Sequence, residues 1–141
     1  MSLPSAGYPH PDETEVNRPF LEGWRRGKLL IQRCADCSMF VFFPRELCPH
    51  CWCSDMQWVE AKGTGEVVSH SLVYSHVTGP FVSEAPVVLA EIRLSEGLTL
   101  LARILVDLSA SIASGMPVEL VPLPEASRYP LPTFRSRLPN G

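Results

Sequence analysis

Four cysteines have the residue type and the spacing for metal binding. Cys34 and Cys37 form one Cys-x-x-Cys pair, Cys48 and Cys51 form a second pair, and ten residues separate the two pairs. Each pair places two sulfur atoms on one tight turn, and two facing turns supply four thiolates to a tetrahedral ion at about 2.3 Å. The spacing therefore predicts a compact zinc ribbon in which these four cysteines are the ligands.

Other uses of these cysteines are less well supported by the sequence. Cys53 is either a spare thiol or an alternative to Cys51, and the standard spacing favours Cys51. His50 is expected to be an exposed turn residue, because four thiolates already complete the site. Redox use of one pair is disfavoured, because no strand–helix context of a thioredoxin motif is present. The ligand set does not distinguish zinc from iron, which leaves an electron-transfer role open.

Length and composition bound the protein class. The chain has 141 residues, which fits one domain or a domain with a small appendage, and its formal net charge is -3. No apolar run approaches the roughly 18 residues of a membrane span, and the first residues lack the features of a signal peptide. Cysteines in metal spacing suit a reducing compartment. We therefore expect a cytoplasmic protein without a membrane anchor.

The chain ahead of the ribbon divides into two parts. Residues 1–16 are rich in proline and polar residues, which predicts an extended or disordered arm. Residues 17–28 predict a short helix, with Asn17 as its N-cap, Pro19 in its first turn and Gly27 at its end. Such a short helix needs a surface to pack on.

The predicted helix has one apolar face, formed by Phe20, Leu21 and Trp24. This face either packs on its own chain or docks on another chain. We favour packing on its own chain, because an exposed face of this kind is uncommon in a monomer.

Residues 29–61 contain the predicted ribbon. Strands are expected at 28–33, 39–43 and 56–60, and they make a sheet so small that the metal must contribute to its folding. We expect the aromatic residues of this segment to cover the sheet or to pack between modules, rather than to stack on nucleic-acid bases. These residues are Phe40, Phe42, Phe43, Trp52 and Trp58.

Residues 62–137 have a different pattern, with alternating apolar residues and turn signals. One helical connector is expected just before Gly115. The pattern predicts a mostly β protein in which a five-stranded Greek-key barrel, an OB-fold, follows the ribbon. The expected strands are 66–77, 87–94, 98–106, 115–121 and 131–137.

The order of these signals resembles a known family. The segments are Pro19-Phe-Leu-Glu-Gly-Trp-Arg-Arg-Gly27, Leu29-Leu-Ile-Gln-Arg-Cys-Ala-Asp-Cys37, Phe43-Pro-Arg45, Cys48-Pro-His-Cys51, Trp58-Val59, Gly63-Thr-Gly65 and Gly115-Met-Pro-Val118. Together they are similar to the zinc-ribbon/OB-fold proteins that accompany thiolases, often called acyl-CoA-associated OB-fold proteins. The resemblance covers about residues 17–137.

The resemblance implies an N-terminal helical segment, a rubredoxin-like zinc ribbon and a C-terminal OB-fold. It also implies an accessory subunit that binds acyl-CoA and a thiolase-like condensing or aldolase enzyme in lipid metabolism, without chemistry of its own. The metal ligands would be Cys34, Cys37, Cys48 and Cys51. The chain departs from the family pattern at Trp52-Cys53, where the family usually has glycine or a similar small polar stretch.

The residues themselves do not indicate an enzyme. A zinc ion with four thiolates has no open position for water or substrate, so its role is structural. His70 and His76 share a strand face, which is more often a surface or core feature than a site. No Ser–His–Asp grouping, phosphate-binding loop or carboxylate pair is evident.

Two binding functions remain. Single-stranded nucleic acid is the alternative, but the chain is acidic and its barrel strands carry few basic residues. Acyl-CoA needs a basic cluster beside an apolar slot, and the helix–ribbon junction supplies candidates for both. We therefore expect a non-catalytic subunit that binds acyl-CoA, a thiolase-like partner, or both, and homo-oligomers remain open. The candidate ligand-binding residues are Phe20, Trp24, Arg25, Arg26, Lys28, Arg33 and Arg45.

Overall fold

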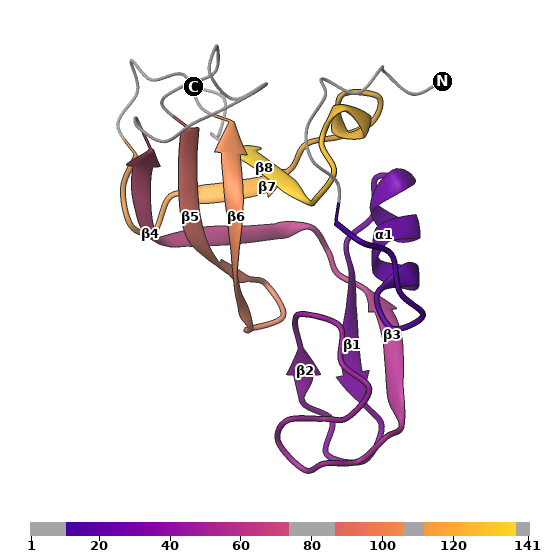
Figure 1. The fold of residues 1–141 in the computed structure, drawn as a ribbon. Helices are drawn as coiled ribbons and strands as arrows, with labels where there is room; N and C mark the ends of the chain where they lie inside the picture. Colours follow the sequence, from indigo (N-terminus) through magenta and orange to yellow (C-terminus); the bar gives the residue numbers. More distant parts are fainter. Residues whose placement is uncertain (1–10, 74–86, 106–111, 138–141) are drawn as a thin grey trace.

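The computed structural model describes residues 11–73, 87–105 and 112–137. A small sheet and a helix lie beside a larger barrel (Figure 1). Several expectations fall outside the described residues: the arm before residue 11, the end of the predicted strand 66–77, and most of the connector before Gly115. Within the described part of the chain, no helix is long and apolar enough to cross a membrane.

Helix α1 (Arg18–Arg25) has Pro19 in its first turn and ends as the sequence predicts. Gly27 adopts a φ of +79°, and its N–H donates to the Trp24 carbonyl at 2.8 Å. The Lys28 N–H donates to the Gly23 carbonyl at 2.9 Å. This pair of hydrogen bonds is a Schellman motif, which needs a left-handed residue where Gly27 stands.

The start of α1 differs from the prediction. Asn17 occupies the N-cap position, but its side chain makes no capping hydrogen bond. Its Oδ1 accepts from the Thr14 N–H at 2.7 Å, and its Nδ2 donates to the Asp12 carbonyl at 2.9 Å. The side chain therefore stabilises the turn before the helix, because asparagine bonds local backbone on either side equally readily.

Replacing Gly27 by alanine should destabilise the protein through two effects. Backbone strain at positive φ costs about 1–2 kcal/mol, and an added Cβ would lie 2.8 Å from Leu123 Cγ. Gly115, with a φ of +89° and open space around its Cα, is a matched control that carries the strain alone. Urea unfolding should show a larger loss for Gly27→Ala than for Gly115→Ala. Equal losses would mean that Leu123 moves aside at no cost.

The ribbon is a three-stranded antiparallel sheet in the order β2-β1-β3. Its strands are β1 (Leu30–Cys34), β2 (Phe40–Val41) and β3 (Met56–Glu60). Strand β2 is shorter than the expected 39–43. It stops early because Phe43 has a φ of +66°, which turns the chain away from the sheet before Pro44.

The second module is a closed barrel in the order β4-β5-β6-β8-β7, with β7 paired back onto β4. Every pairing is antiparallel except β6 with β8, which is parallel. A bulge between Val67 and Ser69 lets the long strand β4 bend. The barrel confirms the predicted OB-fold. Its strands are β4 (Thr64–Val73), β5 (Val87–Leu94), β6 (Thr99–Leu105), β7 (Pro117–Leu120) and β8 (Thr133–Ser136).

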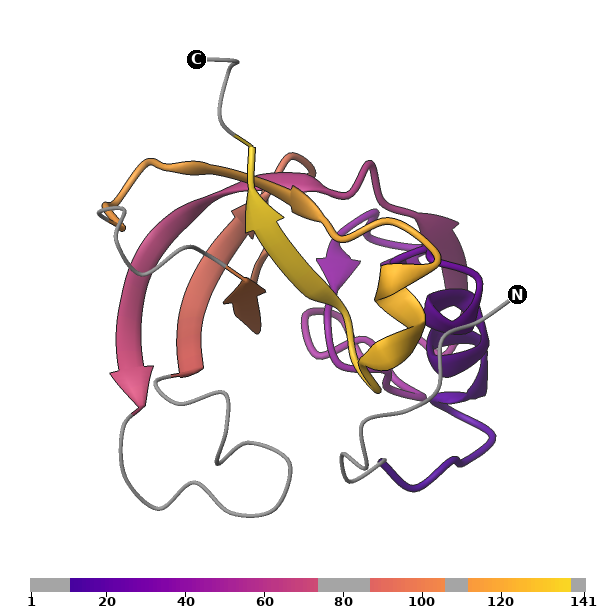
Figure 2. The ribbon, with the colours of Figure 1, turned by 90° about the horizontal axis from the view of Figure 1, so that it is seen from above.

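The proline-rich stretch before β8 contains the short 3-10 helix η2 (Glu125–Arg128). Helix η2 lies next to α1 (Figure 2). The indole Nε1 of Trp24 donates to the Tyr129 carbonyl at 2.9 Å, and Trp24 packs with Val121 and Ala126. The apolar face of α1 is therefore buried on its own chain, as favoured from the sequence.

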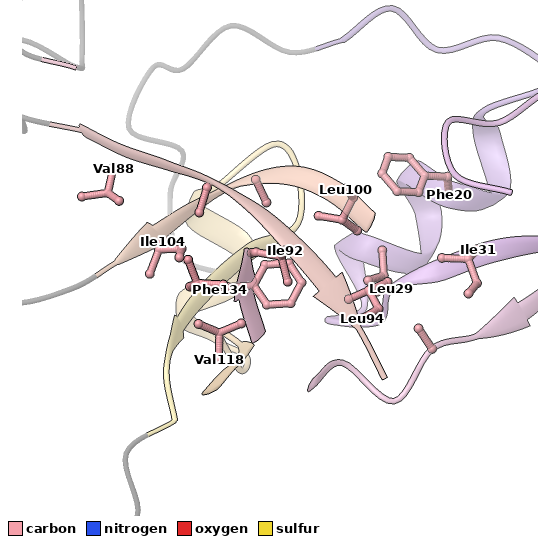
Figure 3. Packing of buried hydrophobic residues seen from close by; sticks show 14 of the residues in the cluster. Phe20, Leu29, Ile31, Val88, Ile92, Leu94, Leu100, Ile104, Val118 and Phe134 are labelled. Carbon is pink, nitrogen blue, oxygen red and sulfur yellow. The ribbon is translucent and has the colours of Figure 1, made fainter. Parts of the chain in front are cut away.

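One continuous apolar core joins the modules. It runs from Phe20 of α1 and Ile31 of β1 to Val118 and Phe134 inside the barrel (Figure 3). Phe20, Ile31 and Phe134 are all at most 6% exposed. Because apolar burial is the main source of folding free energy, the ribbon and the barrel are held together by the same packing that stabilises each module.

The aromatic residues of the ribbon divide into two groups. Phe40, Phe42 and Trp58 pack against the core, which agrees with the prediction. Trp52 and Phe43 are 74% and 66% exposed, so the expectation that they cover the ribbon is wrong. Both have positive φ angles, and Phe43 contacts Phe42 with 5.0 Å between the ring centroids.

Candidate metal centre and apolar groove

The two Cys-x-x-Cys turns bring four sulfur atoms together at the end of the ribbon. The Sγ atoms of Cys34, Cys37, Cys48 and Cys51 all lie within 4.8 Å of one another. Zn–S bonds of about 2.3 Å in a tetrahedron place the sulfur atoms about 3.8 Å apart. Two Sγ–Sγ distances are close to this value, 3.5 Å between Cys34 and Cys51 and 3.6 Å between Cys37 and Cys48. The donor set fits a closed, structural zinc site.

Backbone N–H groups stabilise the thiolates. The N–H of Cys37 donates to Cys34 Sγ at 3.4 Å, and the N–H of His50 donates to Cys48 Sγ at 3.4 Å. These bonds form because each turn folds back over its first cysteine. They favour the charged sulfur that a metal needs.

The four thiols do not ionise equally. The hydrogen bond from the Cys37 N–H lowers the pKa of Cys34 to about 7. At Cys51 the N–H of Cys53 favours the thiolate, but burial and the neighbouring thiols outweigh it and raise the pKa of Cys51 to about 12. Four thiolates this close together would repel one another, so some of the cysteines keep their protons until a cation binds and neutralises the charge.

Zinc affinity should rise with pH. The metal-free site binds more protons than the zinc-loaded site at neutral pH, since Cys51 stays protonated without metal. Acid therefore favours the metal-free form, and each displaced proton changes the apparent affinity by about tenfold per pH unit. Competition with a chromophoric chelator between about pH 6 and 8 should show at least this slope. An affinity independent of pH would contradict the four-thiolate site.

Cys53 lies beside this centre but outside the four-sulfur cluster. It packs against the cluster, and its Sγ accepts from the Asp55 N–H at 3.4 Å. Its carbonyl also accepts from the Cys48 N–H at 2.9 Å, which closes the second turn. The structure therefore gives Cys53 a place in the turn, while Cys51 faces the other three cysteines.

Gln32 holds the loop between the two turns, a role that sequence reasoning missed. Its side chain is 3% exposed. The Arg45 N–H donates to Gln32 Oε1 at 2.8 Å, and Gln32 Nε2 donates to the Arg45 carbonyl at 2.9 Å. A buried amide that satisfies both backbone groups fixes the loop, and an isolated glutamine within a strand gives no sequence signal of this role.

An apolar groove lies where the ribbon meets the barrel. Its volume is about 290 Å³, and its walls are almost entirely apolar. Phe43, Leu101 and Leu131 at this groove are among the most exposed large apolar residues in the described parts of the chain. The lining comes from α1 (Phe20), the ribbon (Phe42, Phe43), β5, β6 and residues 129–133.

A second hollow, of about 280 Å³, is more polar and adjoins the groove. Tyr129 and Pro130 line both hollows. The second one also has Trp24, Arg25 and Ser127 in its wall. The guanidinium groups of Arg103 and Arg128 lie 5.6 and 6.0 Å from the centre of the Tyr129 ring. The apolar groove is thus followed by a hollow with a larger polar share, in which Arg25 is the basic side chain of the wall.

The candidate ligand-binding residues are distributed over several places. Phe20 lines the groove, and Trp24 and Arg25 line the second hollow. Arg25 also pairs with Glu13 at 3.1 Å.

The other four candidates lie elsewhere. Arg26 is exposed at the end of α1, and Lys28 lies 3.9 Å from Glu60. Arg33 stacks on Phe40 at 5.6 Å, and the Arg45 backbone bonds Gln32. These four basic residues fall within residues 26–45, but the structure does not gather them around one of the two hollows.

Family models match the chain in two adjoining segments. Residues 21–57 match the rubredoxin-like zinc ribbon domain of ChsH2, and residues 58–122 match the C-terminal OB-fold domain of ChsH2. A DUF35 domain-containing scaffold protein of Methanocaldococcus jannaschii is 33% identical over 107 residues, which cover 72% of this chain and 74% of that protein. The chain belongs to the DUF35 family.

Other similar proteins agree with this DUF35 assignment. A solved structure described as the Ltp2-ChsH2(DUF35) aldolase has a TM-score of 0.78 and 35% identity, covering 92% of this chain and all of that one. A DUF35 protein of unknown function from Sulfolobus solfataricus has a TM-score of 0.62 at 18% identity, covering 86% of this chain and 85% of that one, and it shows the shared fold.

One relative is longer than this DUF35 chain. A probable enoyl-CoA hydratase alpha subunit of Thermomonospora curvata is 37% identical over 137 residues, which cover 97% of this chain. The chain spans 42% of the length of that relative.

Proposed function

We propose that this DUF35 protein is a non-catalytic accessory subunit of a thiolase-like enzyme in cytoplasmic acyl-CoA metabolism, and that it also binds acyl-CoA. The observation that carries the proposal is the match of nearly the whole chain, at 35% identity, to the structure described as the Ltp2-ChsH2(DUF35) aldolase. The relative called a hydratase alpha subunit supports an assembly around acyl-CoA chemistry.

The chemistry of the site supports a non-catalytic role. Four thiolates fill the coordination sphere of zinc, so the ion has no position for water or substrate. His70, one of the histidines considered from the sequence, is exposed on β4, and His76 lies outside the described residues. The protein therefore contributes binding surfaces, and the reaction belongs to the partner.

The groove supports the acyl-CoA part of the proposal. An acyl chain is apolar and suits the groove, while the phosphates of coenzyme A suit the more polar hollow that shares Tyr129 and Pro130 with it, where Arg25 supplies a cation. With this placement, three of the sequence-based candidates remain: Phe20, Trp24 and Arg25. It adds Leu101 and Tyr129, which sequence reasoning did not select.

Titration with acyl-CoA thioesters of increasing chain length tests this part. Each methylene buried in the groove should strengthen binding by up to about fourfold, from roughly 0.8 kcal/mol per methylene. Leu101→Arg should weaken binding of the longer thioesters, and Leu72→Arg, at an exposed leucine on β4, is the control. An affinity for free coenzyme A equal to that for the thioesters would contradict the groove assignment.

The surface of the barrel bears on the nucleic-acid alternative. OB-folds bind single strands with the face that corresponds to β5 and β6 here. On that face Glu91 is paired opposite Leu101, and Arg93 is paired with Glu66 at 3.5 Å. Such a surface lacks the basic track that gives affinity for phosphates. We therefore expect weak binding to fluorescent single-stranded DNA at physiological salt. Tight binding with a steep salt dependence would favour the alternative.

A further inference from the structure

Trp52 is the most exposed large apolar residue in the described parts of the chain. Its side chain is 74% exposed, directly after the second cysteine pair at the tip of the ribbon. Its φ is +64°, in the left-handed region that a bulky residue rarely adopts. The fold gains little from this side chain, since most of it lies in water.

The geometry of the turn explains why residue 52 has a positive φ, but it does not explain why this residue is a tryptophan. Ser38 stands at the equivalent position of the first turn and has a φ of +65°. Both turns therefore need a left-handed residue after their second cysteine, and glycine meets that need at the lowest cost. A tryptophan there costs about 1–2 kcal/mol and exposes a large apolar surface. A residue whose type is unfavourable for its backbone conformation, and which adds no packing in return, is expected at a functional position.

The part of the ribbon that carries Trp52 has an excess of acidic residues. Within residues 34–55, the exposed Asp36, Glu46 and Asp55 outnumber the one Lys or Arg residue, the exposed Arg45. The Ala35 N–H donates to the Asp55 carbonyl at 2.9 Å, which holds the two turns side by side. A zinc ion with four thiolates adds a net negative charge. A partner that accepts Trp52 must therefore surround its apolar pocket with basic side chains.

We propose that Trp52 is the docking anchor of this protein and inserts into an apolar pocket, edged by arginine or lysine, on the thiolase-like partner. This inference rests on the proposed function. Exposed tryptophans that become fully buried are the residues that most often dominate binding energy at protein interfaces. The acidic rim accelerates association and fixes the orientation of the ribbon tip.

Two matched variants test the anchor in the complete chain. Trp52→Gly and Ser38→Gly both relieve the strain at a left-handed position, so both should bind zinc and be at least as stable as the unmodified protein. Only Trp52→Gly removes the aromatic side chain. With the purified thiolase-like enzyme of the same organism, we expect Trp52→Gly to weaken binding by about 30-fold or more, and Ser38→Gly to leave it unchanged.

A label on the tryptophans reports the contact directly. The chain has three tryptophans, so a 5-fluorotryptophan-labelled protein gives three 19F signals. Adding the unlabelled partner should shift the Trp52 signal, assigned by its absence in Trp52→Gly, and the binding should weaken with added salt.

Three results would overturn the inference, and they can be told apart. Equal affinity of Trp52→Gly and the unmodified protein would remove Trp52 as the anchor and leave the proposed function standing. A Trp52 signal that shifts with the concentration of the chain alone would make a second copy the occupant. No binding of the unmodified protein would remove the proposed function as well.

Discussion

Cys48→Ser should abolish zinc binding and unfold the ribbon. Cys48 is fully buried, and its Sγ lies 3.6 Å from that of Cys37. The ribbon sheet is too small to fold on its own apolar surface, since β2 has only two residues. Structural zinc contributes about 10–16 kcal/mol to small domains of this kind. Metal analysis and the amide dispersion of NMR spectra should show a zinc-free chain with a disordered ribbon.

Cys53→Ser is the matched control for this prediction. Cys53 has the same chemistry and lies near the site, but its sulfur is outside the four-sulfur cluster. This variant should retain zinc and an ordered ribbon. Retention of zinc by Cys48→Ser, or its loss in Cys53→Ser, would assign the ligands differently.

Trp24→Ala should destabilise the protein by about 3–5 kcal/mol. Trp24 is 2% exposed and fills the space between α1 and η2. Its removal leaves a cavity and also leaves the Tyr129 carbonyl without its indole donor. The same change should disturb the wall of the second hollow, which Trp24 and Tyr129 both line. Chemical unfolding followed by far-UV circular dichroism measures the loss.

Trp24→Phe separates the two contributions. It keeps part of the buried aromatic volume and removes the indole donor, so it should cost less than Trp24→Ala, about 1–3 kcal/mol. A loss below about 1 kcal/mol for Trp24→Ala would show that α1 does not pack on its own chain in solution. In that case the apolar face of α1 would be exposed in solution and could bind a partner.

The parts of the fold with strong local constraints could be predicted from the sequence. The cysteine spacing permits one compact arrangement, so the ribbon follows from it. The barrel follows from alternating strands and turn residues, because a strand with one buried face has a fixed period. The bounds of β3 and β5 agree with the predicted strands 56–60 and 87–94.

The parts that depend on long-range contacts could not be predicted. Helix η2 lies in a proline-rich stretch and is stabilised by packing against Trp24, about a hundred residues earlier in the chain. The exposure of Phe43 and Trp52 depends on positive φ angles that their residue types disfavour. Residue type alone therefore indicates burial where the structure shows exposure.

The candidate binding site shows the same limit. The candidate basic residues lie on separate elements: Arg26 follows α1, Arg33 is on β1, and Arg45 is held in a loop by Gln32. The groove is built from five separate segments of the chain. No sequence window contains enough of its lining to reveal it.

The most direct test of the accessory-subunit assignment is purification of the tagged chain from its native host, with identification and quantitation of everything that elutes with it. We expect a thiolase-like enzyme in a fixed ratio to the chain and about one zinc ion per chain. Elution with nucleic acid or with ribosomal and transcription proteins, and without such an enzyme, would contradict the assignment and leave the zinc ribbon and the OB-fold as a nucleic-acid-binding module.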